Sequence, residues 1–453
     1  MWPLVALLTC AFVASLWYSI VRYVPLALRS PHQGPMKVGV VLGSGGHTSE
    51  MLRVITGLPS SYWSGTRPFY VISATDTHSC SLASQLEQRR FERGAIVYTI
   101  PRAREVGQSY LTSIVTTLKA TLACFRLVCT EKPDVLLTNG PGVCVPVIAA
   151  ALCVASCAPW WYGRPAVVYM ESFTCVSHLS LTGRLLAPWV ADVFTVHWRT
   201  LERVVTQRRH RGTLVHVGCE EARATKSAAH RLRLLADEQE PYALVTVGST
   251  RFPALVAAMV QPGVCAALHQ RFGIERLYVQ HGTAEVVVPA EATLLPAAPT
   301  IAGADASHST QVWSCGGLLV EAFSYRPHLD AVIRGAALVI THAGAGTILE
   351  GLQAQRALVV VPNRQLMSDH QLELAEALAA GGFLFCVQVA ELAERLPLLD
   401  LTRLRPHPGM DAAQLQGALQ LVLTGYSASG EKTKTAQSRE YAGAVNANSD
   451  RCL

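Results

Sequence analysis

Short apolar runs alternate with segments of helical periodicity along most of the chain. In the first half these runs lie at Lys37–Leu42, Phe69–Ser73, Ala95–Thr99, Val135–Thr138, Val167–Met170 and Asp192–Val196. Runs this short and rich in β-branched residues are typical of strands buried in a parallel sheet. Their alternation with helical segments predicts a Rossmann-like α/β lobe.

The same alternation starts afresh in the second half. We predict strands at Ala243–Val247, Leu277–Gln280, Ala337–Ile340 and Leu358–Val361. Two such patterns indicate two doubly wound lobes with a cleft between them. We place the first lobe at 36–206 and the second at 242–426, joined by a charged, irregular linker at 207–241.

Composition supports a folded protein of two to three domains. The chain has 453 residues, of which 50% are hydrophobic and 15% charged, which excludes wholesale disorder. Residues 285–315 are rich in Ala, Pro and Ser and are interpreted as an insertion loop. The polar residues 427–453 are predicted to be a disordered tail.

The N-terminal segment Met1–Val21 contains no charged residue. About 20 apolar residues suffice to cross a bilayer as a helix. A cleaved signal peptide is the alternative, but it would carry a basic n-region. We therefore predict a transmembrane anchor at 1–22. Arg22, Arg29 and Lys37 follow the span and none precedes it, so the lobes are predicted to face the cytoplasm.

A second uncharged stretch covers Val143–Trp161. It could be another membrane span, but Pro141 and Pro146 interrupt its start, and strand–turn–helix patterns flank it. We interpret it as a buried or membrane-facing helix of the first lobe.

Charge and cysteine usage narrow the class of protein. The net charge of +6 is modest for this length, and no nucleic-acid-binding motif accompanies it. It suits contact with phosphates or anionic headgroups. The 13 cysteines show no CxxC pair, and there is no Asn-x-Ser/Thr sequon, which favours reduced thiols facing the cytosol.

Each lobe contains a glycine turn between a strand and a helix, at Gly43–Gly46 and at Gly344–Gly346. Such turns also occur for packing alone. A helix N-terminus after a glycine turn offers free N–H groups and partial positive charge to a diphosphate. Two of them indicate two phosphate-bearing ligands in one cleft, as a transferase that joins a nucleotide-sugar to a phosphorylated acceptor requires.

Polar residues close to these turns are candidates for the chemistry. His47 could be a general base or merely a hydrogen-bond donor to phosphate. Glu350 could bridge ribose hydroxyls or be a solvated residue at a helix start. Asn363, Asp369, His370 and Gln371 cluster at the next strand end, where their side chains suit sugar hydroxyls.

Several motifs in the first half resemble the Alg14 family, the membrane-anchoring subunit of the dolichol-pathway N-acetylglucosaminyltransferase. They are GSGGHTSEM at 43–51, RAREVGQS at 102–109, NGPG at 139–142, ESF at 171–173 and LSLTGRL at 179–185.

The second half resembles the Alg13 family, the donor-binding partner subunit. Its motifs are VTVGST at 245–250, THAGAGTILE at 341–350 and LMSDHQLELA at 366–375. The Gly-Ser-Thr at 248–250 departs mildly from the Gly-Thr-Thr of the Alg13 pattern. The order of the halves is the lobe order of the bacterial MurG family.

The resemblance implies an Alg14–Alg13 fusion with a GT-B fold in the endoplasmic reticulum membrane. It implies transfer of GlcNAc from UDP-GlcNAc to GlcNAc-diphosphodolichol, with inversion and a β1,4 linkage. The base is expected to be His47 or Glu171. The acceptor diphosphate is assigned to Gly43, Ser44, Gly45, Gly46 and Thr48. The donor is assigned to Gly248, Ser249, Thr250, His342, Gly344, Ala345, Gly346, Thr347, Glu350, Asn363, His370 and Gln371.

The sequence leaves other functions and other assembly states open. No acidic pair stands at a convincing strand end, so neither a catalytic metal nor a cofactor is expected besides the donor UDP-GlcNAc. The chain could use a different UDP-sugar on a polyprenyl-diphosphate, or be a non-enzymatic scaffold that recruits a transferase. It could act alone, as a homo-oligomer, or with other dolichol-pathway transferases.

Overall fold

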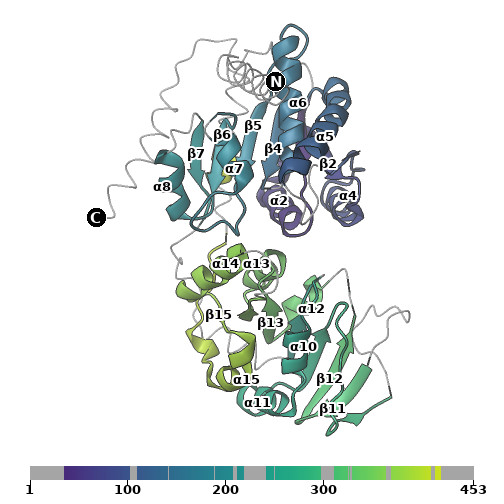
Figure 1. Ribbon diagram of the computed structural model, residues 1–453, viewed down its shortest axis with the longest axis vertical. Coiled ribbons are helices and arrows are strands. Elements are labelled where there is room, and N and C mark those ends of the chain that lie inside the picture. Colours follow the sequence, from purple (N-terminus) through teal and green to yellow (C-terminus); the bar gives the residue numbers. More distant parts are fainter. Residues whose placement is uncertain are drawn as a thin grey trace, which may run out of the picture.

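The chain folds into two α/β lobes, as the alternating pattern predicts (Figure 1). The computed structural model describes residues 35–102, 110–140, 142–187, 189–207, 212–218, 241–248, 250–296, 311–324, 326, 329–363, 369–409 and 414–419.

The first lobe is built on a seven-stranded sheet with the order β3-β2-β1-β4-β5-β6-β7. All neighbouring strands are parallel. The strands are β1 (Met36–Val41), β2 (Thr66–Ser73), β3 (Val97–Ile100), β4 (Val135–Asn139), β5 (Ala166–Met170), β6 (Val193–Val196) and β7 (Thr213–His216). The central strands β4 and β5 are buried along their whole length because helices cover both faces of the sheet.

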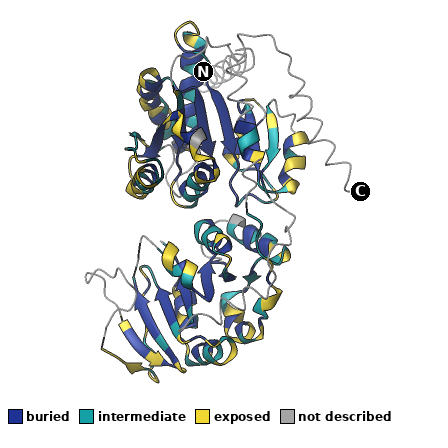
Figure 2. Ribbon diagram, turned by 180° about the vertical axis from the view of Figure 1, so that it is seen from behind, coloured by how far each residue is buried: buried dark blue, intermediate teal, exposed yellow. Residues whose placement is uncertain are grey.

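Helices form one layer on each face of this sheet, and Figure 2 shows the buried strands between them. One face carries α5 (Tyr110–Glu131), α6 (Cys144–Cys157), α7 (Leu181–Leu186) and α8 (Arg199–Gln207). The other carries α2 (Gly46–Gly57), α3 (Ser60–Ser64) and α4 (Thr77–Phe91).

The second lobe has an eight-stranded sheet with the order β10-β11-β12-β9-β8-β13-β14-β15. Its strands are β8 (Tyr242–Thr246), β9 (Arg276–Gln280), β10 (Thr293–Leu294), β11 (Gln311–Cys315), β12 (Leu318–Phe323), β13 (Leu338–His342), β14 (Ala357–Val361) and β15 (Phe385–Cys386). One face carries α10 (Pro253–Met259), α11 (Pro262–Phe272) and α15 (Leu392–Arg395). The other carries α12 (Asp330–Gly335), α13 (Ala345–Gln353) and α14 (Asp369–Ala380).

Both sheets have a topological switch point, where the strand order reverses. It lies between β1 and β4 in the first lobe and between β8 and β13 in the second. Loops that leave two such neighbouring strands run in opposite directions, and a crevice opens at their carboxyl ends. Both glycine turns follow strands at these points, so the topology itself directs them towards a ligand site.

The predicted linker at 207–241 is wrong at its start. Thr213–His216 forms β7, which pairs in parallel with β6 and completes the first sheet. Its burial pattern is only intermediate because it is the edge strand. A four-residue edge strand within a charged stretch has too weak an apolar signal to stand out in the sequence.

The predicted boundary of the second lobe at 426 also needs correction. Residues 414–419 are helical, and Leu415, Ala418 and Leu419 are buried in the core of the first lobe beside α2. The chain therefore returns to the lobe in which it began. The contact buries three apolar side chains and ties the two lobes together.

The predicted insertion loop at 285–315 is partly a sheet edge. Thr293–Leu294 and Gln311–Cys315 form the antiparallel strands β10 and β11 beside β12. The fully buried Trp313 on β11 anchors this edge in the core. Residues 297–310 lie outside the described part.

The predicted membrane anchor at 1–22 and the tail at 427–453 also lie outside the described residues. Among the helices of the described part, none combines the length and the apolar character that a membrane span requires. The second apolar stretch forms α6, most of which is buried in the first lobe. This agrees with its interpretation as a helix of a globular lobe.

Candidate active site

The first glycine turn connects β1 to α2. Gly45 has φ 67° and ψ −124°, a conformation that a residue with a side chain rarely adopts, and α2 begins at Gly46. No side chain caps this helix. Its first N–H groups therefore have no side-chain partner in the described residues, and the anion site assigned to this turn stays a prediction.

Thr48 differs from the other residues assigned to this turn. It is fully buried, and its hydroxyl donates to the carbonyl of Gly43 and lies 2.6 Å from the Ser79 hydroxyl. Ser79 in turn donates to Asp76 at 2.6 Å. The side chain of Thr48 thus braces the turn from inside, whereas Ser44 and Gly45 are exposed.

His47 is the second residue of α2 and is held on one side by the loop that follows β4. A Cβ built on Gly140 would lie 2.5 Å from His47 Cε1, so only glycine fits there. The Asn139 amide donates to the His47 carbonyl at 2.7 Å. The two loops at the β1/β4 switch point therefore meet at this histidine.

Two carboxylates lie near His47. Its Nδ1 is 3.6 Å from Glu50 Oε2, one turn further along α2. Glu171, at the end of β5, is fully buried and accepts hydrogen bonds from Ser172 N and from both N and Oγ of Ser180. Burial raises the pKa of Glu171 against these hydrogen bonds. Both oxygens of Glu171 therefore accept hydrogen bonds from the 171–180 loop and stabilise it. This makes Glu171 a weaker candidate for the base than His47.

The second glycine turn connects β13 to α13, and a buried histidine fills the space beneath it. A Cβ on Gly344 would lie 2.3 Å from His342 Nε2, and one on Gly248 would lie 2.9 Å from His342 Cε1. Burial lowers the pKa of His342 to about 4, so its ring is neutral. His342 thus positions the two loops of the β8/β13 switch point instead of facing solvent.

The two glycine turns meet across the cleft. A Cβ on Gly46 would lie 3.6 Å from the Ala345 Cβ and 3.7 Å from Gly346 N. Arg53, two turns further along α2, and Glu350, one turn further along α13, also meet: Arg53 Nη2 lies 3.5 Å from Glu350 Oε1. The structure therefore brings the N-terminal turns of α2 and α13 next to each other, and Figure 1 shows the two helices at the junction of the lobes.

The remaining donor candidates lie around this junction. Thr250 donates its hydroxyl to the Val247 carbonyl at 2.7 Å, which closes the turn after β8. Asn363 is buried and donates to the Arg251 carbonyl at 3.4 Å. Gln371 is partly buried, and its Oε1 makes no hydrogen bond to any residue that the structure describes. Thr347 lies in the first turn of α13. Ser249 and the side chain of His370 lie outside the described part.

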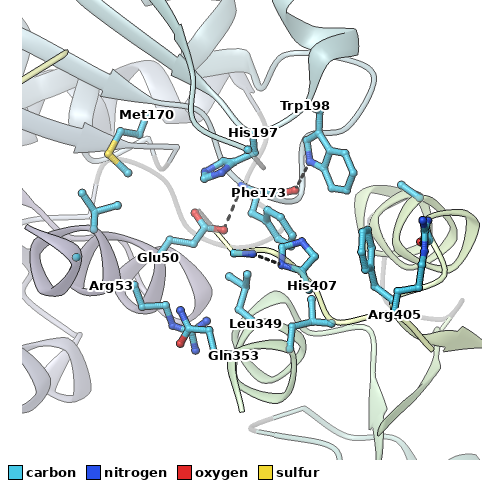
Figure 3. Close-up of a pocket in the computed structure, with 18 residues that line it drawn as sticks. Glu50, Arg53, Met170, Phe173, His197, Trp198, Leu349, Gln353, Arg405 and His407 are labelled. Atoms are coloured by element: carbon cyan, nitrogen blue, oxygen red, sulfur yellow. Dashed lines mark hydrogen bonds between the residues drawn. The ribbon is translucent and has the colours of Figure 1, made fainter. Parts of the chain in front are cut away.

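The lobes also join through an aromatic contact behind the glycine turns. Phe173, from the loop after β5, is part of the hydrophobic core of the second lobe. It stacks on Trp198 at 5.5 Å and meets His407 edge-on at 6.0 Å. Figure 3 shows these rings around a cavity of about 530 Å³ between the lobes, with Arg53 on its wall.

Known families match both halves of the chain. The family described as "Oligosaccharide biosynthesis protein Alg14 like" matches residues 38–214. The "Glycosyltransferase family 28 C-terminal domain" matches residues 242–422. The first half is 35% identical over 216 residues to UDP-N-acetylglucosamine transferase subunit ALG14 of Rattus norvegicus, covering 46% of this chain and 94% of the relative.

The second half has a relative of its own. It is 34% identical over 166 residues to UDP-N-acetylglucosamine transferase subunit ALG13 of Cryptococcus neoformans, covering 34% of this chain and 80% of the relative. The chain belongs to the Alg14 and Alg13 families, joined in that order. The first lobe is therefore the Alg14 half and the second the Alg13 half.

A solved structure supports the same arrangement of lobes. MurG of Acinetobacter baumannii superposes with a TM-score of 0.52 at 19% identity, covering 86% of this chain and 99% of that one. At this identity the likeness shows the fold, which is GT-B with two Rossmann-like lobes.

Sequence reasoning missed four residues of the site. Glu50 and Arg53 lie one and two turns beyond His47 on the same helix, so helical spacing alone could have indicated them. Gly140 and Phe173 lie in the NGPG and ESF motifs of the Alg14 half, but only their contacts in the structure reveal a role. In the described residues no group of three or more His, Cys, Asp or Glu could hold a metal. The absence of a catalytic metal stays a prediction.

Proposed function

We propose that this chain transfers GlcNAc from UDP-GlcNAc to GlcNAc-diphosphodolichol, with inversion and a β1,4 linkage. The observation that carries the proposal is the meeting of two uncapped helix N-termini, one from each half, beside His47. One terminus suits the donor diphosphate and the other the acceptor diphosphate. Both relatives are named subunits of a UDP-N-acetylglucosamine transferase, and here both halves stand in one chain.

In the proposed reaction, the acceptor 4-hydroxyl attacks the anomeric carbon of GlcNAc. The bond from that carbon to the UDP oxygen breaks, and its electron pair stays on the diphosphate. His47 takes the proton of the attacking hydroxyl. The N–H groups at the start of α13 stabilise the charge on the departing UDP.

The purified chain, given UDP-GlcNAc and a GlcNAc-diphosphate lipid, tests this function. We expect a β1,4-linked disaccharide on the lipid without any added partner. A panel of UDP-sugars separates this activity from transfer of another sugar. UDP-GlcNAc binding without turnover would instead support the scaffold alternative.

Glu350 is proposed to bind the donor ribose. Its carboxylate is 36% exposed and belongs to the second turn of α13. Hydrogen bonds to a charged group contribute about 1.5–3 kcal/mol. Glu350→Ala should therefore raise the KM for UDP-GlcNAc about 10–100-fold, with the KM for the lipid acceptor unchanged. Equal rises in both KM values would contradict a donor-specific role.

The outer face of the Alg14 half is proposed to rest on the endoplasmic reticulum membrane. On α5, Val115, Leu118 and Leu122 are 56%, 60% and 62% exposed. Trp160, just after α6, is 84% exposed. Leu181, Leu185 and Trp189 on the same helical layer are also exposed. Lys119, Arg126 and Lys132 add positive charge, which suits an interface with anionic headgroups.

Leu118→Asp combined with Leu122→Asp tests this face. We expect turnover of a long-chain acceptor in vesicles to fall at least about tenfold, since burial of each leucine contributes about 1.5–3 kcal/mol. Turnover of a short, water-soluble acceptor should stay at the wild-type level. A loss on both acceptors would point to damage to the fold instead.

A further inference from the structure

A buried carboxylate on α2 connects His47 to the loop that joins the lobes. Glu50 is 6% exposed. Its Oε2 lies 3.6 Å from His47 Nδ1. Its Oε1 accepts hydrogen bonds from Ser172 Oγ at 3.0 Å and from Phe173 N at 3.3 Å. One oxygen therefore faces the candidate base, while the other is held by the Alg14 loop that packs into the Alg13 half. Figure 3 shows the hydrogen bond between Glu50 and Phe173 from the cavity side.

The His47 ring is enclosed at Nδ1 and at Cε1, and the rest of its side chain is partly exposed. Nδ1 is buried and makes no other hydrogen bond in the described residues, and the Glu50 carboxylate faces it at 3.6 Å. The side chain as a whole is 32% exposed, and Gly140 packs against Cε1. The ring is thus held from the helix side and the loop side. A neutral imidazole carries one proton, and the nitrogen that keeps it is set by the partner of that nitrogen.

His47 and Glu50 each favour the charged form of the other. Burial would lower the pKa of His47, but Glu50 and, at longer range, Glu171 bring it above its ordinary value. Burial would raise the pKa of Glu50, but His47, His197 and the Ser172 hydroxyl bring it below its ordinary value. Arg53 is the other charged group that interacts with Glu50. Glu50 is therefore ionised and ready to accept the Nδ1 proton.

We infer that Glu50 is a positioning residue for the transfer reaction: it keeps the proton of His47 on Nδ1, so that Nε2 receives the proton of the attacking hydroxyl. The inference rests on the proposed function and on His47 as its base. When the acceptor oxygen bonds to the anomeric carbon, its proton moves to Nε2 and UDP leaves with the electron pair. Glu50 then faces an imidazolium, which its charge stabilises, and it takes up no proton itself.

Glu50→Gln separates this role from a purely structural one. The glutamine oxygen can still accept from Ser172 and Phe173, but its amide donates to His47 Nδ1 and favours the tautomer with the proton on Nε2. We expect kcat to fall about 100-fold, with both KM values within about twofold of the wild type. Without the carboxylate the pKa of His47 falls, so the acidic limb of the pH profile should move to lower pH.

Three further variants make the result decisive. Glu50→Asp keeps the charge and should restore part of the loss and return the acidic limb towards its wild-type position. Ser172→Ala removes a hydrogen bond to Glu50 but leaves the carboxylate, so kcat should change less than about fivefold. The double variant Glu50→Gln with His47→Ala should be no slower than His47→Ala alone, because the two residues act as a unit.

The outcomes that overturn the inference are distinct from a failure of the proposed function. Wild-type kcat in Glu50→Gln, or losses that multiply in the double variant, would show that Glu50 does not act through His47. A wild-type chain that makes no disaccharide from UDP-GlcNAc and the lipid would instead refute the proposed function. Circular dichroism of each variant checks that the fold is intact.

Discussion

Replacing His47 by Ala should lower kcat by about 10²–10⁴-fold, the range typical of a positioned general base. His47 stands at the start of α2, between the loop after β4 and the carboxylate of Glu50. It also directly follows the first glycine turn in sequence. The measurement is the initial rate of disaccharide formation at saturating lipid acceptor and UDP-GlcNAc.

A matched control distinguishes catalysis from general damage. Glu394 lies exposed on α15, on the face of the second sheet opposite α13, so Glu394→Ala should retain wild-type kcat. UDP binding to His47→Ala should also persist, because the donor residues lie in the Alg13 half. If His47→Ala keeps turnover within about threefold of the wild type, His47 is only a phosphate-contacting residue.

Phe173→Ala should destabilise the joined lobes by about 3 kcal/mol. Removal of a buried phenylalanine costs about 3–5 kcal/mol. Phe173 is 6% exposed and lies against Trp198, His197 and His407, in a core that otherwise belongs to the Alg13 half. We expect the lower end of the range, because the ring borders a cavity of about 530 Å³. Water from this cavity can fill the space that the removed ring leaves.

Urea unfolding followed by tryptophan fluorescence measures this loss, since Trp198 donates its Nε1–H to the Phe173 carbonyl at 2.9 Å. Leu398→Ala is the control, because Leu398 is 80% exposed and should change stability by less than about 0.5 kcal/mol. An unchanged midpoint for Phe173→Ala would mean that the loop does not hold the lobes together.

Much of the architecture follows from local sequence signals. The runs at β1, β4, β8 and β13 are short, apolar and followed by glycine or a polar turn, and helices follow at 3.6-residue periodicity. Those features depend on near neighbours in the chain. They suffice to predict two Rossmann-like lobes and the two turns that meet in the cleft.

Elements with weak local signals were misplaced. β7 is a four-residue edge strand inside a charged stretch, and it exists because β6 offers it hydrogen-bonding groups. The 414–419 helix belongs to the first lobe because Leu415 and Leu419 fill its core. The residues that stabilise β7 and the 414–419 helix cannot be identified from these two segments alone. For β7 they lie about 20 positions away in the chain, and for the helix several hundred positions away.

The site also has features that the sequence predicts and features that only the tertiary structure shows. The sequence by itself determined that glycine turns stand at the starts of α2 and α13, with His47 and Glu350 beside them, because backbone geometry at a turn demands glycine locally. Only the tertiary structure shows which carboxylate lies next to the histidine. Glu171 and Glu50 look alike in sequence, but three hydrogen bonds engage Glu171 inside the fold, whereas helix geometry and the Ser172–Phe173 loop aim Glu50 at His47. The role of an ionisable group depends on burial and partners, and long-range packing sets both.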